Sequence, residues 1–263
     1  MAVEKEPASV SRGRITLLKV PLDIVPPDEL PEIICRQLLN ITGDVSGQRQ
    51  GQNIVLLSLW DLLKARRNRE YRNFILHSSL VIPISKSLVS GARFLKKKVP
   101  VRYMPFHFII NLLSILENRE FTVYLLGGKD RILRRVENNI HQTFPRLQIV
   151  GRCNASFRKQ EEGAIVEAIR KAAPHLLLTG RGIPGGEFWI SRNNEKLNRG
   201  IRLWCSDLFD VFAEKRKRPA ESIFNLGLEA FYYCFRNPLR ILRIFPYFYY
   251  KLLLLVYRLG NKD

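Results

Sequence analysis

The feature that most constrains the fold is a set of glycines that end apolar runs in the middle of the chain. One apolar run ends at Gly127 and Gly128, a second at Gly151, and a third at Gly180 and Gly182. Short apolar runs between helical segments are typical of strands in a mainly parallel sheet. Ligands of such sheets bind at the carboxyl ends of the strands. The glycines therefore predict a phosphate or nucleotide pocket, although a glycine pair equally suits a plain turn.

The same alternation of apolar runs and helical periodicity extends through most of the 263 residues. It predicts strands at 14–20, 53–59, 80–84, 121–126, 149–151 and 176–179, and helices from about residue 27, at 61–75, at 106–119, at 131–144 and after residue 161. This order indicates the α/β class, with a mainly parallel, Rossmann-like sheet flanked by helices. We expect a flexible start at 1–13, an α/β domain at 14–214 and a basic, aromatic, membrane-facing appendage at 215–263.

The charge balance indicates an anionic partner. Lys and Arg number 43 against 24 Asp and Glu, which gives a formal net charge of +19. Nucleic acid is one such partner, but the sequence carries no helix-turn-helix, zinc-finger or RNA-recognition signature, so specific nucleic-acid binding is not expected. An anionic membrane surface would also attract this chain, at about 1 kcal/mol for each nearby Lys or Arg.

The segment at 235–259 combines basic and aromatic side chains. Arg236, Lys251 and Arg258 lie among Phe, Tyr and Leu, a composition typical of a segment in the lipid headgroup zone. The segment is too short and too charged to span a bilayer, which takes about 20 mainly apolar residues. The alternative is a helix that buries the apolar run at 252–257 against the protein's own core.

The four cysteines show neither C-x-x-C spacing nor a histidine partner at metal-ligand spacing. Because the amino terminus carries no secretory signal, we expect reduced thiols in a cytoplasmic protein. The sequence therefore predicts no structural metal and no cofactor, and a cytoplasmic location at the inner face of the cell membrane. It leaves open whether the chain forms a homo-oligomer.

Several short motifs occur in an order that is more specific than any one of them. They are ITLLKVPLD from Ile15, VYLLGGK followed by FPRLQIVG, the GxPxxEFWI element from Gly182, the LFD that ends at Asp210, and GLE followed by NPLR. In this order they resemble the WecG/TagA/CpsF glycosyltransferases, from about residue 15 to residue 243. The resemblance implies transfer of a sugar, with inversion, from a UDP-sugar donor to a polyprenyl-diphosphate-linked acceptor at the bacterial membrane.

The resemblance also implies which residues hold the substrates. A glutamate in the nucleotide-sugar crevice accepts hydrogen bonds from ribose or sugar hydroxyls, and an arginine-rich carboxyl terminus closes over the site. Arginines suit a diphosphate because the guanidinium offers paired donors to phosphate oxygens. The matching substrate-binding positions are Gly127, Gly128, Gly182, Pro184, Glu187, Arg218, Arg240 and Arg243.

Many positions where the family carries its chemistry are substituted in this chain. Ile84 of LVIPIS stands at the usual place of the catalytic aspartate, and Leu56 and Ser58 stand at those of a threonine and an asparagine. Pro105 and His107 replace a G-x-D pair. The remaining substitutions are the missing glutamine of the P-x-Q-E element, Ala230 for a tryptophan and Tyr233 for an arginine.

His107 and Asp210 are the candidates for a substitute catalytic group. A general base contributes about 10²- to 10⁴-fold, and another side chain can take over the proton. His107 lies in the apolar run MPFHFII, which is also typical of a core histidine, and Asp210 also suits a helix start. Glu187 likewise suits the first turn of a helix, where the dipole stabilises an acid.

Two functions are therefore open at this point. The leading hypothesis is transfer of a hexosamine-type sugar in the synthesis of a surface polysaccharide or cell-wall glycopolymer. The alternative is a catalytically impaired relative that binds a nucleotide sugar or a membrane partner and acts as a scaffold.

Overall fold

The computed structural model describes residues 13–42, 52–197, 200–218, 220–228 and 245–260. Residues 1–12 of the expected flexible start lie outside the described residues. So do Arg240 and Arg243, which were predicted to bind the diphosphate, and the substituted positions Ala230 and Tyr233.

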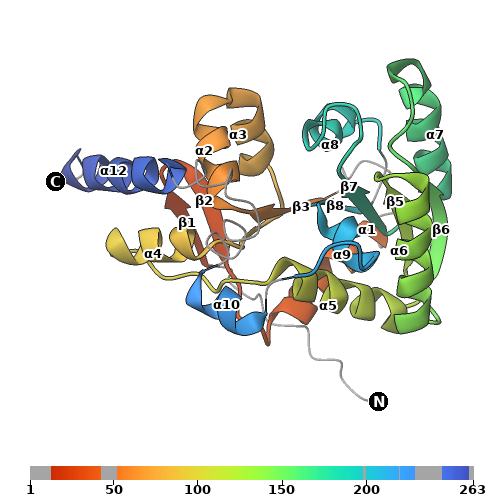
Figure 1. The fold of residues 1–263 in the computed structure, drawn as a ribbon, viewed down its shortest axis with the longest axis horizontal. Helices are drawn as coiled ribbons and strands as arrows, with labels where there is room; N and C mark the ends of the chain where they lie inside the picture. Colours follow the sequence, from red (N-terminus) through yellow and green to blue (C-terminus); the bar gives the residue numbers. More distant parts are fainter. Residues whose placement is uncertain (1–12, 43–51, 198–199, 219, 229–244, 261–263) are drawn as a thin grey trace, which may run out of the picture.

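A six-stranded sheet forms the centre of the molecule, in the order β4-β3-β8-β7-β5-β6 (Figure 1). Every neighbouring pair of strands is parallel, which confirms the predicted α/β class with its parallel sheet. The strands are β3 (Gln52–Leu57), β4 (Leu80–Pro83), β5 (Thr122–Leu126), β6 (Gln148–Cys153), β7 (Leu176–Gly180) and β8 (Ile201–Ser206). No strand is predicted from the sequence at β8, which nevertheless lies between β3 and β7 in the sheet.

Helices cover both faces of the sheet. One face packs against α1 (Leu30–Thr42), α5 (Pro105–Asn118), α6 (Asp130–Thr143) and α9 (Leu208–Phe212). The other packs against α2 (Leu59–Arg67), α3 (Arg69–Leu76), α7 (Glu162–Ala172) and α8 (Phe188–Asn193). Alternate side chains of a strand enter the two layers: Val123 and Leu125 of β5 join the first, and Tyr124 and Leu126 join the second.

The opening segment forms a hairpin where one strand was predicted at 14–20. β1 (Gly13–Leu17) and β2 (Val20–Ile24) pair antiparallel, joined by Leu18 and Lys19, whose φ angles are 49° and 69°. Such left-handed pairs close two-residue hairpins. Asp23 then ties β2 to the sheet edge, because its carboxylate pairs with Arg14 at 2.7 Å and accepts the Val81 N–H at 2.6 Å. The edge of β4 is thereby covered.

The helix predicted at 61–75 is divided in two at Asn68. This residue ends α2 and also begins α3, where its side-chain oxygen accepts the Tyr71 N–H at 2.8 Å. An asparagine side chain competes for backbone N–H groups in this way, and periodicity alone does not reveal the break.

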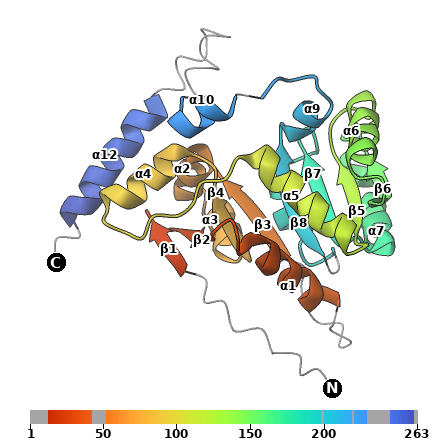
Figure 2. The same cartoon turned by 90° about the horizontal axis from the view of Figure 1, so that it is seen from below.

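Two helices from the last part of the chain, α10 (Glu221–Leu226) and α12 (Phe245–Gly260), lie close in space to α4 (Lys86–Phe94) (Figure 2). α12 packs against α2 and α4 (Figure 2). It buries Tyr250 and Leu254, while an apolar ridge stays exposed at Phe245, Phe248, Leu252, Leu255, Val256 and Leu259. The helix thus contributes to the core and still presents apolar surface. Within the described ranges, no helix combines the length and the apolar character needed to cross a bilayer.

Candidate functional site

A pocket of about 530 Å³ lies where β3, β4 and β8 end. We call it the Ile84 pocket. The direction of winding changes here, because β4 lies on one side of β3 and the later strands lie on the other. Open α/β sheets bind their ligands at such switch points. The residues that line the pocket include Leu56, Ser58, Asp61, Ile84, Pro105, Glu187, Trp204 and Asp207.

Ser58 and Asp61 form a capping box at the start of α2, within the lining of the Ile84 pocket. Asp61 Oδ2 accepts the Ser58 N–H at 2.8 Å and the Ser58 hydroxyl at 2.5 Å. Tyr71 donates its hydroxyl to Asp61 Oδ1 at 3.2 Å. Burial, followed by the charge of Asp61, raises the pKa of Tyr71, so this hydroxyl remains a donor.

Asp61 was not among the sequence-predicted site residues. Its S-x-x-D spacing from Ser58 is a recognisable helix-start signal, but that signal reports a cap and carries no information about a pocket. Only the neighbouring strand brings it close to the usual place of the catalytic aspartate: the Ile84 N–H donates to Leu57 O at 2.9 Å, and Leu57 directly precedes Ser58.

Glu187 enters the Ile84 pocket from the start of α8. Its carboxylate forms an ion pair with Lys64 of α2, whose ammonium also lies 4.5 Å from the centre of the Phe188 ring. The side chain makes no capping hydrogen bond to α8. Glu187 therefore faces the pocket, and its place at the N-cap of α8 is also compatible with the interpretation in which the helix dipole stabilises the acid.

Asp207 is a second carboxylate that the sequence analysis missed. It follows β8 and pairs with Arg181 at 2.8 Å and with Arg216 at 2.5 Å. Partial burial acts to raise the pKa of Asp207, but the hydrogen bonds and charges of the two arginines outweigh it and lower the pKa below the usual value. Asp207 is thus held ionised within a fixed ion-pair network.

A second hollow, of about 300 Å³, lies farther along the same edge of the sheet, and we call it the glycine hollow. It brings together Gly128, Gly182 and Asp210, three of the sequence-predicted site residues. Ser206 lines both this hollow and the Ile84 pocket, so the two adjoin. The basic residues that line the glycine hollow are Lys129, Arg181 and Lys215.

The glycine pair after β5 has a structural reason. The Gly127 N–H donates to Cys153 O and the Gly128 N–H donates to Arg181 O, both at 2.8 Å. Gly127 has a φ of 121°, and a Cβ placed there would lie 2.7 Å from the carbonyl oxygen of Gly180. These N–H groups already have partners within the protein, so the hydrogen bonds favour the plain-turn interpretation over a phosphate cradle. The hollow would attract an anion through the positive charge of its basic residues.

Pro184 lies in the loop before α8, where its carbonyl accepts a hydrogen bond from Arg192 Nη2 at 2.9 Å. Gly185 and Gly186 follow it with φ angles of 86° and 57°. A Cβ on Gly185 would lie 1.9 Å from Arg192 Nη2. The loop that carries Glu187 is therefore shaped by this arginine together with two left-handed glycines.

A third hollow, of about 260 Å³, adjoins the Ile84 pocket and shares Ile84, Pro105, Leu208 and Val211 with it. We call it the basic channel, because Lys86, Arg102 and Arg218 line it. Arg102 donates to Ile84 O at 2.9 Å, and its guanidinium lies 3.6 Å from the centre of the Phe224 ring. Burial lowers the pKa of Arg102 to about 10, which still leaves it charged at neutral pH.

His107 lies beside the basic channel, where its ring Nε2 contacts Arg218 at 3.2 Å and its Nδ1 contacts Glu221 at 3.3 Å. Both ring nitrogens are thus engaged by neighbouring side chains. His107 is not among the residues that line the Ile84 pocket. As for metals, the described residues contain no cluster of three or more His, Cys, Asp or Glu side chains suited to hold an ion.

The profile of the glycosyl transferase WecG/TagA/CpsF family matches residues 15–262. The chain belongs to this family. A relative from Bacillus spizizenii strain W23, N-acetylglucosaminyldiphosphoundecaprenol N-acetyl-beta-D-mannosaminyltransferase, is 21% identical over 193 residues, which cover 73% of this chain and 74% of the relative. The resemblance deduced from the motifs is thereby confirmed.

Four of the substituted positions of the WecG/TagA/CpsF pattern meet in one place. Leu56, Ser58, Ile84 and Pro105 come from three separate segments, and all four line the Ile84 pocket together with Glu187. Three of these four side chains are apolar where the family pattern is polar or glycine. The pocket is therefore lined by apolar side chains at three positions where the resemblance implies polar residues or glycine.

Proposed function

We propose that this protein transfers a hexosamine-type sugar from a UDP-sugar to a sugar on a polyprenyl-diphosphate carrier. The observation that carries the proposal is the pocket itself: a chain that matches the family over residues 15–262 keeps about 530 Å³ of space at the switch point of its sheet. The B. spizizenii relative is named for an N-acetylmannosaminyl group and an undecaprenol-diphosphate acceptor, which supports a related donor and acceptor here. Such a step would serve the synthesis of a surface polysaccharide or cell-wall glycopolymer.

The donor would extend from the glycine hollow into the Ile84 pocket, across their shared residue Ser206. Lys129 and Lys215 provide positive charge for the diphosphate in the hollow. The donor sugar would then lie beside Glu187, whose carboxylate can accept hydrogen bonds from sugar hydroxyls. This assignment keeps Gly128, Gly182 and Glu187 in the donor site and gives Gly127 and Pro184 the role of shaping its loops.

The reaction needs an acceptor for one proton. In an inverting transfer, the acceptor hydroxyl oxygen bonds to the anomeric carbon, the bond to UDP breaks with its electron pair on the phosphate oxygen, and the hydroxyl proton leaves. Ile84 cannot take this proton. Asp61 lines the same pocket and holds the hydroxyl of Ser58, so it is the carboxylate we assign as the base.

The two substitutes predicted from the sequence do not line the Ile84 pocket. Asp210 lines the glycine hollow, next to the proposed diphosphate site. His107 is engaged by Arg218 and Glu221 at the side of the basic channel. Asp210 and His107 are to be substituted alongside Asp61, because a carboxylate or an imidazole can serve as a base once it reaches the hydroxyl.

The acceptor requires that the protein work at a membrane surface. The exposed ridge of α12, with Lys251 and Arg258 on the same helix, suits contact with an anionic leaflet. Peripheral attachment at the inner face of the cell membrane is the arrangement that this surface supports.

The second candidate function is a scaffold that binds a nucleotide sugar without transferring it. The isoleucine at position 84 specifically favours this alternative, because it removes the usual base while the pocket survives. A scaffold would retain affinity for UDP-sugars and show no turnover.

The deciding experiment follows radiolabelled sugar from a panel of UDP-N-acetylhexosamines to polyprenyl-diphosphate-linked N-acetylglucosamine, using the full chain. Transfer from one donor is the expected result. Binding of UDP-sugars without transfer to any acceptor would favour the scaffold. Absence of both binding and transfer would overturn the donor site.

A further inference from the structure

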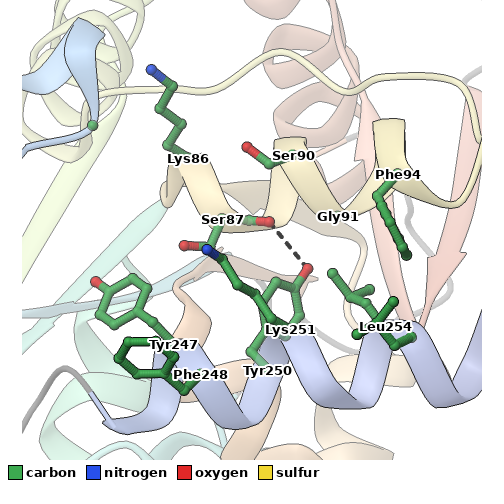
Figure 3. A pocket seen from close by; sticks show the side chains of 12 residues that line it. Lys86, Ser87, Ser90, Gly91, Phe94, Tyr247, Phe248, Tyr250, Lys251 and Leu254 are labelled. Atoms are coloured by element: carbon green, nitrogen blue, oxygen red, sulfur yellow. Dashed lines mark hydrogen bonds between the residues drawn. The ribbon is translucent and has the colours of Figure 1, made fainter.

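An apolar groove of about 640 Å³ lies between α4 and α12. Side chains from the two helices face one another across it (Figure 3). Phe94 contributes from α4, and Phe248, Leu254 and Leu255 contribute from α12, while Lys86 and Lys251 add positive charge to the lining. A groove of this composition suits a ligand that combines a hydrocarbon chain with an anionic headgroup.

One close contact fixes the two helices around this groove. The Tyr250 hydroxyl donates to Ser87 O at 3.1 Å, beside Gly91. A Cβ on residue 91 would lie only 1.9 Å from the Tyr250 hydroxyl, so glycine is required for this approach. Tyr250 is only 3% exposed. The groove is therefore a built feature of the fold and not a chance gap beside a loosely attached helix.

The groove continues into the proposed active site. It shares Lys86, Ser87, Gly227 and Tyr247 with the basic channel. The basic channel in turn shares Ile84 and Pro105 with the Ile84 pocket. A ligand can thus extend from apolar walls, past three basic side chains, to the place where the sugar would be transferred.

We propose that this groove binds the isoprenoid chain of the acceptor lipid, with the diphosphate in the basic channel and the acceptor sugar in the Ile84 pocket. The inference rests on the proposed function. Its support is the match of order: the apolar groove, the basic channel and the Ile84 pocket with its carboxylates follow one another as chain, diphosphate and sugar do in such a lipid. Lys86, Arg102 and Arg218 provide the positive charge between the two ends.

The groove shares Phe248 and Leu255 with the outward ridge that we assign to the membrane. Leu255 lines the groove, whereas Leu252 is not among its lining residues, and both belong to α12. They are 49% and 58% exposed. These two leucines therefore form a matched pair: the same change at either removes similar apolar surface from the membrane side, but only the change at Leu255 alters the groove.

The test is equilibrium binding of farnesyl diphosphate, inorganic diphosphate and farnesol to the full chain, without donor. We expect farnesyl diphosphate to bind at least about tenfold more tightly than inorganic diphosphate, because several methylene groups leave water. Leu255→Gln, and Ser90→Trp, which fills the groove, should remove that advantage without changing the affinity for inorganic diphosphate. Leu252→Gln should retain it.

Equal binding of farnesyl and inorganic diphosphate, or equal effects of the two leucine variants, would overturn the groove as the site. A benzophenone-bearing isoprenoid diphosphate provides a second measurement. Crosslinks should map to peptides from α4 and the groove side of α12, and crosslinks confined to the Leu252 and Val256 ridge would contradict the proposal.

Transfer assays separate this inference from the proposed function. If farnesyl diphosphate binds in the groove but no sugar is transferred, the function fails and the groove stands. If transfer occurs with the same acceptor KM for short and long isoprenoid chains, and Leu255→Gln behaves like Leu252→Gln, the groove fails and the function stands.

Discussion

The Ile84 pocket and the glycine hollow lie side by side at one edge of the sheet, yet they are built differently. The glycine hollow is formed where turns with positive φ angles follow the strands, at Gly128 after β5 and at Gly182 after β7. The Ile84 pocket is formed mainly by side chains from β3, α2, α3, β8 and α9, together with Ile84, Pro105 and Glu187. The resemblance to the family implies that Leu56, Ser58, Ile84 and Pro105 are substitutions. One region thus depends on backbone geometry, whereas the other depends on the chemistry of its side chains.

This difference has a physical origin. A turn such as the one at Gly127 holds β5 against β7, so replacing the glycine would disturb the sheet whether or not a ligand binds. Ile84 and Leu56, by contrast, fill space in the wall of a pocket, where an apolar side chain is compatible with folding. The glycines at the strand ends are therefore evidence for the fold, whereas evidence about catalysis has to come from the side chains that line the pocket.

The largest effect is expected from removing the candidate bases of the two regions one at a time. Asp61→Asn should reduce turnover by about 10²- to 10⁴-fold, because the amide cannot accept the acceptor proton. Asp210→Asn and His107→Gln should reduce it far less. Turnover of labelled donor measures the difference.

Asp61 also caps α2, and this requires its own control. Ser58→Ala breaks the capping box but keeps the carboxylate, at a cost of about 1 kcal/mol in unfolding free energy. If Ser58→Ala and Asp61→Asn lose the same activity, the cap explains the loss. If Asp210→Asn is the inactive variant, the base belongs to the glycine hollow.

A substitution in the glycine turn should lower the unfolding free energy more than it weakens ligand binding. Gly127→Ala forces a Cβ against the Gly180 backbone at a φ of 121°, which should lower the unfolding free energy by about 3 kcal/mol. Gly163→Ala is the matched control: it lies in α7 with open space around it, and should stabilise the protein by up to about 1 kcal/mol. Urea denaturation compares them. Unchanged stability of Gly127→Ala with weakened UDP-sugar binding would make the turn a ligand cradle after all.

Glu187 tests whether the donor reaches the Ile84 pocket. Glu187→Ala should weaken UDP-sugar binding about tenfold, because hydrogen bonds from the sugar to a carboxylate are lost. Calorimetric titration gives the affinity, and Glu195→Ala, an exposed acid after α8, is the control. Unchanged affinity in a folded Glu187→Ala variant would restrict the donor to the glycine hollow.

The smallest effect concerns the ion pairs at Asp207, next to the junction of the two regions. Its folded-state pKa is lowered, so the ionised form stabilises the fold at pH values above the unfolded pKa of about 3.9. That contribution is lost as the pH falls from there through the lower folded pKa. Asp207→Asn should therefore be less stable than the wild type at pH 7. The difference in unfolding temperature between the variant and the wild type should become smaller below about pH 4. A difference that is constant with pH would mean that the ion pairs do not contribute.

The sequence predicted the sheet class and the family because both depend on local patterns. Apolar runs, helical periodicity and the motif order are readable from neighbouring residues. Elements with a weak local signal were not predicted, and β8 is one of them. The segment predicted as a single strand at 14–20 is a hairpin, because Leu18 and Lys19 adopt left-handed backbone angles. Asn68 likewise interrupts a helix by a side-chain hydrogen bond that periodicity does not show.

For the candidate site, too, some features are readable from the sequence and others only from the tertiary structure. From sequence alone come the parallel sheet, the glycine-marked strand ends and the substitution of the usual aspartate by Ile84. Only the tertiary structure joins Asp61 to Ile84, engages His107 with Arg218 and Glu221, and connects the α4–α12 groove to the basic channel. The physical reason is that strand and turn propensities act between neighbours in the chain, whereas a pocket depends on which distant side chains the packing of the sheet and its helices brings within a few ångströms.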